Sequence, residues 1–276
     1  MSIRIHHLNC GTMCPLCERL INGQGSWRKP GRLICHCLLI ETPQALVMVD
    51  TGIGQHDIRE PARRLGAGFL PLLRPQLRLA ETAHAQITSL GYDPRDVRHI
   101  IPTHLDMDHA GGLSDFPDAQ VHVFKPEMRA VLHPRRLDLV RFRQPQFEHK
   151  PHWVVHDTMT ERWFDFDAIR PIQEMAADIL IVPLIGHTEG HVGVAVKQGE
   201  RWLLHCGDAY YHHSQVTATP QAPLGLKIFE AAVQTLRQPR LQNQARLRRL
   251  AADHGDEVEL FCAHDPVELD RYTNAT

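Results

Sequence analysis

The sequence lacks a surplus of charge of either sign, because 30 Lys and Arg residues nearly balance 32 Asp and Glu residues and leave a formal net charge of −2. Without a basic excess, no electrostatic field exists to bind a nucleic-acid backbone or an anionic membrane, so neither is expected as a partner. Histidine, by contrast, is abundant, with 20 residues. Histidine is the side chain most often used for metal binding and for proton transfer near neutral pH.

The sequence also lacks long apolar runs. None approaches the roughly 18–20 residues of a membrane-spanning helix, and the longest, at 177–185, contains Asp178 and Pro183. The first residues, Met1 to His7, have no apolar core of the kind found in signal peptides. The seven cysteines are an odd number, and reduced thiols are the simplest interpretation. We therefore expect a cytoplasmic protein.

Short apolar runs in both halves of the chain are typical of strands. They are Ile3–Leu8, Arg32–Glu41, Ala45–Asp50, Val97–Pro102, Ala119–Phe124, Ile179–Leu184, His191–Lys197, Trp202–Cys206 and Val258–Ala263. Helices are predicted at Glu81–Leu90 and at Leu224–Leu250, the second with a break near Pro239. This order predicts one α+β (or α/β) domain over residues 1–276, with sheets packed between helices.

Residues 129–170 combine weak periodicity with clustered arginines and aromatics. We interpret this stretch as a cap or insertion. A cap of this composition would bind an amphipathic or anionic small molecule. The alternative is a solvated insert, or a dimer contact whose aromatic side chains are buried in a homodimer.

The most specific motif is the segment Thr103–Gly112, which holds four possible metal ligands within six residues, directly after a predicted strand. These ligands are His104, Asp106, Asp108 and His109. Residues at i, i+2 and i+4 of an extended segment point the same way, and a mixture of imidazole nitrogen and carboxylate oxygen suits hard and borderline cations. The motif alone is also compatible with a solvated polar loop.

Three later segments repeat the pattern of a ligand-capable residue at the end of an apolar run. They contain His187, Asp208 and His264. Loops at the ends of rigid strands are a common way to preorganise a multidentate site. Together with Thr103–Gly112, these segments predict one metal centre.

At these residues, and over nearly the whole chain, the sequence resembles the metallo-β-lactamase superfamily, in particular its N-acyl-homoserine lactonase-like branch. The resemblance implies a four-layered αβ/βα sandwich with a one- or two-metal site at the edge of the sheets. It implies that His104, His187 and residue 106 hold a first ion, that Asp108, His109 and His264 hold a second, and that Asp208 bridges both. It also implies that Tyr211 assists the substrate carbonyl, with Tyr210 as the rival candidate, and that the segment Asp50-Thr51-Gly52 is structural. His191 would pack or form hydrogen bonds behind the site.

Residue 106 departs from the family pattern His-x-His-x-Asp-His, because it is Asp where His is usual. An aspartate makes the metal core less positive and shifts preference from zinc toward iron or manganese. A second possibility is that the shorter side chain fails to reach the first ion. We expect Asp106 to be a ligand and two divalent ions to bind, with zinc as the first expectation and iron or manganese as alternatives.

The implied reaction is hydrolysis of a lactone or carboxylic ester by a metal-bound hydroxide, with Asp108, Asp208 and Tyr211 as the catalytic residues. One alternative is an iron-dependent redox enzyme similar to a thiol or persulfide oxygenase. Another is a catalytically weak ligand-binding protein of the same fold. In each case the expected partner is a small molecule.

The cysteines offer a rival site, because Cys10, Cys14 and Cys17 follow the spacing C-x3-C-x2-C. Such spacing can hold zinc or an iron–sulfur cluster. The alternative, which we prefer, is a group of thiols near the first strand without a metal.

Overall fold

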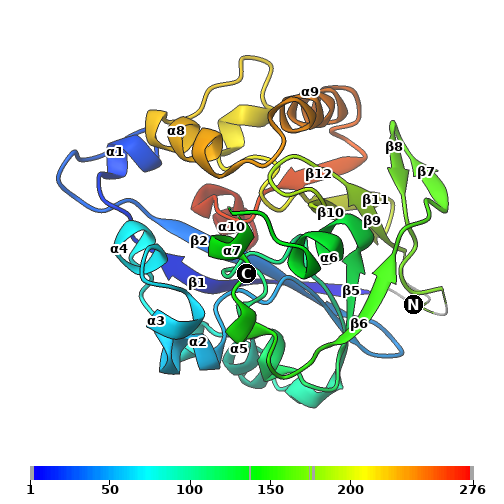
Figure 1. The fold of residues 1–276 in the computed structure, drawn as a ribbon. Coiled ribbons are helices and arrows are strands. Elements are labelled where there is room, and N and C mark those ends of the chain that lie inside the picture. Colours follow the sequence, from blue (N-terminus) through cyan, green and yellow to red (C-terminus); the bar gives the residue numbers. More distant parts are fainter. Residues whose placement is uncertain (1–2, 137, 174, 176–177, 274–276) are drawn as a thin grey trace.

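The computed structural model describes residues 3–136, 138–173, 175 and 178–273, and two mixed sheets form its centre (Figure 1). The first sheet has six strands in chain order: β1 (Arg4–Met13), β2 (Leu33–Glu41), β3 (Leu46–Val49), β4 (Val97–Ile101), β5 (Gln120–Phe124) and β6 (His152–His156). The second sheet has four strands in the spatial order β12 (Val258–Phe261), β11 (Arg201–His205), β10 (Val192–Gln198) and β9 (Ile179–Pro183). A separate two-stranded sheet pairs β7 (Glu161–Trp163) with β8 (Phe166–Ala168).

The direction of pairing follows from the connections. Short links join β2 to β3 and β9 to β10 to β11 as antiparallel neighbours. β1 is also antiparallel to β2, across a longer link that contains a short helix, whereas β3 to β6 run parallel. Parallel neighbours need a long crossover, usually helical. The described helices are α1 (Glu18–Ile21), α2 (Gln55–Arg59), α3 (Pro61–Arg64), α4 (Phe69–Leu73), α5 (Ala83–Ser89), α6 (Lys125–Leu132), α7 (Asp138–Arg141), α8 (Leu224–Val233), α9 (Arg237–Asp253) and α10 (Pro266–Thr273).

The alternation of side chains along the strands produces the layers. In β2, Leu38 and Ile40 pack toward the second sheet, whereas Leu39 packs toward the helices that include α5. In β9, Ile181 faces the first sheet and Leu180 faces the side covered by α9. Helices therefore cover both outer faces of the paired sheets (Figure 1). The predicted four-layered αβ/βα sandwich is confirmed.

Several local features differ from the sequence prediction. The helical run 224–250 breaks at Gln234–Leu236, not near Pro239, which lies in the first turn of α9. Proline is tolerated there because the first-turn N–H groups have no partner within the helix. Strand β6 was not predicted; it extends the first sheet from within the stretch 129–170, which also contains α7. Among the described residues, every helix is too short or too polar to span a bilayer.

Candidate metal centre

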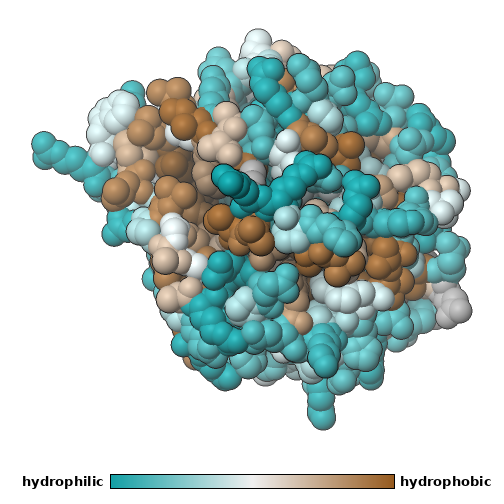
Figure 2. All heavy atoms as spheres, viewed as in Figure 1, coloured by the Kyte–Doolittle hydropathy of each residue, from teal (hydrophilic) through white to brown (hydrophobic). Residues whose placement is uncertain are grey.

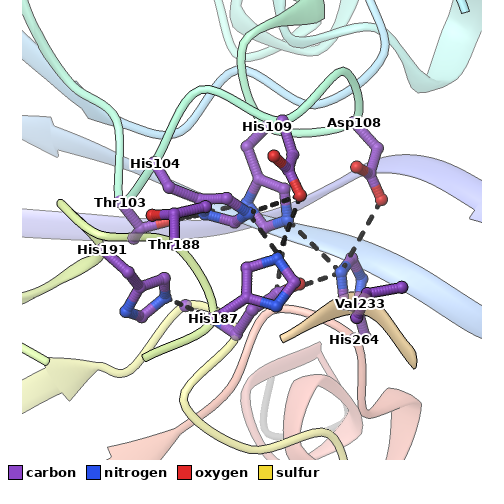
Figure 3. Close-up of polar contacts among 12 residues, drawn as sticks. Thr103, His104, Asp108, His109, His187, Thr188, His191, Val233 and His264 are labelled. Atoms are coloured by element: carbon purple, nitrogen blue, oxygen red, sulfur yellow. Dashed lines mark hydrogen bonds and ion pairs between the residues drawn. The ribbon is translucent and has the colours of Figure 1, made fainter. Parts of the chain in front are cut away.

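The seven predicted ligands lie together at one edge of the two sheets. Asp106 and its neighbours follow the C-terminal end of β4, His187 follows β9, Asp208 follows β11 and His264 follows β12. Because the carboxyl ends of these strands meet at the same edge, residues more than 150 positions apart come into contact (Figure 3). All seven side chains are buried or nearly so.

One half of the cluster gathers His104, Asp106 and His187 around one oxygen of Asp208. His187 Nε2 lies 2.9 Å from Asp106 Oδ2. His104 Nε2 lies 3.4 Å from the same Asp106 oxygen. Asp208 Oδ2 lies 3.6 Å from His187 Nε2 and 3.9 Å from His104 Nε2. Asp106 therefore reaches this group despite being shorter than a histidine.

The other half gathers His109, His264 and Asp108 around the second oxygen of Asp208. Asp208 Oδ1 lies 3.3 Å from His109 Nε2 and 3.1 Å from His264 Nε2. Asp108 Oδ2 lies 3.7 Å from His264 Nε2 (Figure 3). Asp208 thus presents one oxygen to each group of histidines, which is the geometry of a bridging carboxylate.

The donor atoms fit divalent cations. Within the described part of the chain, His104 Nε2 and Asp208 Oδ1 are buried and have no hydrogen-bond partner. Burying such atoms unpaired costs free energy, so native proteins rarely leave them without a partner or an ion. Imidazole and carboxylate together are also the ligands expected for zinc, iron or manganese.

Hydrogen bonds behind the cluster turn the histidine Nε2 atoms inward. Asp50 Oδ2 accepts from His109 Nδ1 at 2.9 Å, and the Ile34 carbonyl oxygen accepts from His264 Nδ1 at 2.7 Å. His191 Nδ1 donates to the Leu184 carbonyl oxygen, which leaves Nε2 to accept from the Asp208 N–H at 2.8 Å. Such outer contacts fix the tautomer and orientation of metal ligands. The predicted place of His191 behind the site is confirmed.

The charges within the cluster stabilise its carboxylates. Burial alone would raise the pKa of Asp208, but the adjacent His264 and His109 rings hold it well below its usual range. Burial would likewise raise the pKa of Asp106, and the Arg141 guanidinium with His104 holds it well below. Both side chains are therefore anionic at neutral pH, as cation ligands must be.

Tyr211, and not Tyr210, faces the predicted metal ligands. The Tyr211 hydroxyl donates to Asp208 Oδ2 at 2.6 Å and lies 3.3 Å from His187 Nδ1. Burial, with the charge of Asp208, raises the pKa of Tyr211 well above its usual range, so the phenol stays protonated. Tyr210 instead donates to Glu268 Oε1 at 3.0 Å on the other side of the backbone.

The sequence did not reveal what three side chains at the site contact. Asp50 was expected to be structural, and the structure shows that it orients His109. Arg141 belongs to the stretch 129–170 and reaches Asp106, with 3.5 Å between Arg141 Nε and Asp106 Oδ1. Glu127 accepts from Leu105 N–H and from the Thr188 hydroxyl, and so ties together two ligand-bearing loops. Only the segment Asp50-Thr51-Gly52 offered a motif by which one of them could be found.

A cavity of about 380 Å³ opens over the cluster. Its floor includes Asp106, Asp108, Asp208, His187, His264 and Tyr211, and most of its wall is apolar. The wall residues come largely from α4, α7 and α8, and include Phe69, Leu72, Leu139, Phe229 and Val233. Figure 2 shows apolar side chains gathered on this face of the molecule. The cavity combines a polar reaction floor with a lining suited to a hydrocarbon chain.

Among the described residues, Cys10, Cys14 and Cys17 do not form a group with metal-binding geometry. Cys10 is buried, whereas Cys14 and Cys17 are partly exposed. Among the described residues, the groups with metal-binding geometry contain one cysteine, Cys35, beside Asp108 and His264. A further group, His212, His213 and Asp265, contains no cysteine.

Comparison with known proteins agrees with this geometry. A family described as the metallo-beta-lactamase superfamily matches residues 30–264. A protein of Mycobacterium tuberculosis named a probable metallo-hydrolase is 41% identical over 265 residues, which cover 96% of this chain and 81% of that protein. An N-acyl homoserine lactonase of Azorhizobium caulinodans is 26% identical and is matched over 83% of this chain and 80% of its own length.

Solved structures show the same fold. A Bacillus thuringiensis N-acyl homoserine lactonase variant, with N-decanoyl-L-homoserine at its active site, superposes with a TM-score of 0.69 at 20% identity, over 98% of this chain and 97% of that one. A dizinc quorum-quenching lactonase in complex with its hexanoyl product gives a TM-score of 0.61 at 16% identity, over 96% and 88% of the two chains.

Proposed function

Since this chain belongs to the metallo-beta-lactamase superfamily, we propose that it is a metal-dependent hydrolase of a lactone or a carboxylic ester. The observation that carries the proposal is the position of Asp208, whose two oxygens face two separate groups of buried histidines beneath an open cavity. The relatives described above include a probable metallo-hydrolase and an N-acyl homoserine lactonase, and these names support the same reaction class here.

Seven side chains would hold two divalent ions. The first ion would lie among His104, Asp106 and His187, and the second among Asp108, His109 and His264, with Asp208 shared. Such ions supply Lewis acidity and a water molecule that is nucleophilic near neutral pH. The abundance of nitrogen ligands favours zinc, and the three carboxylates leave iron or manganese as alternatives.

Tyr211 would position the substrate carbonyl. Its hydroxyl is protonated, buried and directed at the metal ligands, so it can donate a hydrogen bond to an oxygen that gains negative charge during attack. Asp208 accepts a hydrogen bond from that hydroxyl, and would carry a proton toward the leaving oxygen.

The cavity indicates the character of the substrate. Its apolar wall excludes water from the reacting carbonyl and favours a substituent such as an acyl chain. We therefore place lactones and esters with an aliphatic substituent ahead of small polar ones.

The proposal is tested with protein purified without added metal. Metal analysis is expected to find up to two divalent ions per chain, and a panel of N-acyl lactones and aliphatic esters of graded chain length should be hydrolysed. Chelation should abolish turnover, and Asp208→Asn should weaken both ions together. Turnover that survives complete removal of metal, or metal-loaded protein that cleaves no lactone or ester, would overturn the proposal.

A further inference from the structure

The carboxylate of Asp106 has two different surroundings. Its Oδ2 atom lies 2.9 Å from His187 Nε2, within the first group of metal ligands. Its Oδ1 atom lies 3.5 Å from Arg141 Nε. Asp106 Oδ1 and Arg141 Nε are both buried, and within the described residues neither has a hydrogen-bond partner. These two unpartnered atoms belong to groups of opposite charge and lie close together.

Arg141 cannot leave this position easily. Its side chain is only 6% exposed. One terminal nitrogen donates to the His187 carbonyl oxygen at 3.1 Å, and the other donates to the Val233 carbonyl oxygen. The guanidinium thus spans the loop after β9 and the end of α8, and presents its Nε edge to Asp106. A buried cation held in this way needs a nearby anion.

Placing a fixed positive charge close to a cation site is unfavourable unless a negative charge lies between them. Asp106 lies between Arg141 and the histidines of the first group. We propose that Asp106 and Arg141 act as one unit in which Arg141 is a positioning residue: it turns Oδ2 of Asp106 toward His104 and His187 and balances the negative charge that Asp adds where the usual motif has a neutral His. This inference rests on the proposed function, because it concerns the first of the two proposed ions.

The proposed pairing of Asp106 with Arg141 has a consequence that would not follow if Arg141 only bound backbone carbonyl groups. If Arg141 serves Asp106, replacing Asp106 by a neutral ligand should remove the need for Arg141. If Arg141 only holds the His187 and Val233 carbonyl groups, its loss should cost the same whichever residue occupies position 106. A double-mutant cycle separates the two cases.

The cycle compares the wild type with Arg141→Met, Asp106→His and the double variant. Cobalt(II) and zinc(II) titrations against a competing chelator report the affinity of each ion, and the cobalt absorption spectrum reports the surroundings of each site. Arg141→Met should weaken one of the two ions by roughly 10–100-fold, the usual effect of losing a contact behind a ligand. Asp106→His alone should weaken the same ion, because the buried guanidinium then lacks its anion. The double variant should recover much of the lost affinity.

Two further variants control the experiment. Arg143→Met removes an arginine that lines the same cavity but donates to the Arg63 carbonyl oxygen, and it should leave both affinities unchanged. Arg141→Lys keeps the charge and should lose less metal affinity than Arg141→Met. If circular dichroism shows that Arg141→Met folds poorly, Arg141→Lys takes its place in the comparison with the wild type. Losses that add in the double variant, or an Arg141→Lys variant as weak as Arg141→Met, would overturn the inference while leaving the proposed function intact. A wild type that binds no metal would overturn both.

Discussion

Asp50 Oδ2 lies 2.9 Å from His109 Nδ1, although the two residues are 59 positions apart in the chain. Asp50 directly follows β3, and its carboxylate also accepts from the N–H and hydroxyl groups of Thr103. It adopts a positive φ of 56°, a conformation that Asp tolerates better than most residues. The contact holds His109 in the tautomer whose Nε2 faces Asp208 and His264.

Replacing Asp50 should therefore weaken one metal ion selectively. Asp50→Asn keeps the size of the side chain but loses the charge that orients His109. We expect the affinity of the second ion to fall by roughly 10–100-fold while the first ion is retained. Metal titration monitored by the cobalt spectrum checks this, with the exposed Asp165→Asn as control. Equal loss of both ions would contradict the assignment of His109 to a separate second site.

Tyr211→Phe should slow hydrolysis without removing metal. The substitution deletes the hydroxyl that donates to Asp208 and leaves the ring stacked against His264. Loss of one donor to a developing oxyanion costs roughly 10²-fold in kcat. The matched control is Tyr210→Phe, whose hydroxyl bonds Glu268, and which should retain kcat. Unchanged kcat in Tyr211→Phe, measured at full metal occupancy, would remove Tyr211 from the mechanism.

Leu139→Lys should raise KM for long-chain substrates more than for short-chain ones. Leu139 lines the cavity and is 60% exposed, so a lysine there is expected to leave the fold intact. A charge beside the bound chain opposes burial of its methylene groups, each worth about 0.8 kcal/mol. KM for long-chain substrates should rise roughly 4-fold for each methylene that loses this burial. KM for short-chain substrates should change little.

Leu132→Lys is the control for this experiment. Leu132 is 65% exposed and lies outside the cavity wall. It should behave as the wild type for every chain length. A Leu139→Lys variant whose KM is independent of chain length would show that the substrate does not contact this wall.

Glu268 makes stability depend on pH. Burial raises the pKa of Glu268 from its ordinary value of 4.5 to about 7. Between these values the folded protein holds a proton that the unfolded chain releases, so the contribution of Glu268 is complete below about 4.5 and is lost as pH rises through about 7. The loss amounts to about 3 kcal/mol.

Glu268→Gln isolates this contribution, because glutamine does not titrate and can still accept from the Cys262 N–H and bond the Tyr210 hydroxyl. As pH rises from 4.5 to 7, the unfolding free energy of the wild type should fall relative to that of the variant. Denaturant melts of the metal-free proteins at several pH values provide the measurement. A difference independent of pH would show that Glu268 is ionised in the folded state.

The strands of the fold were largely readable from local patterns, whereas the four layers were implied by the resemblance to the family. Apolar runs such as Ile179–Leu184 and Val258–Ala263 gave the strands because alternation and β-branched residues are short-range signals. Strand β6 was missed because its sequence, His-Trp-Val-Val-His, is short and carries polar residues at an edge position. The break before α9 was assigned to Pro239 because proline is a strong local signal, yet the first turn of a helix accepts it.

The sequence by itself determined which side chains stand at the ends of strands: the Thr103–Gly112 motif, His187, Asp208 and His264 are all present as local, recognisable segments. Only the tertiary structure decided which oxygen of Asp208 faces which histidines, that Tyr211 and not Tyr210 turns inward, and that Arg141 pairs with Asp106. The reason is that ligand types and strand ends are encoded locally. The direction of a side chain and its charge partner depend on how two sheets and the helix α7 pack, which no short segment specifies.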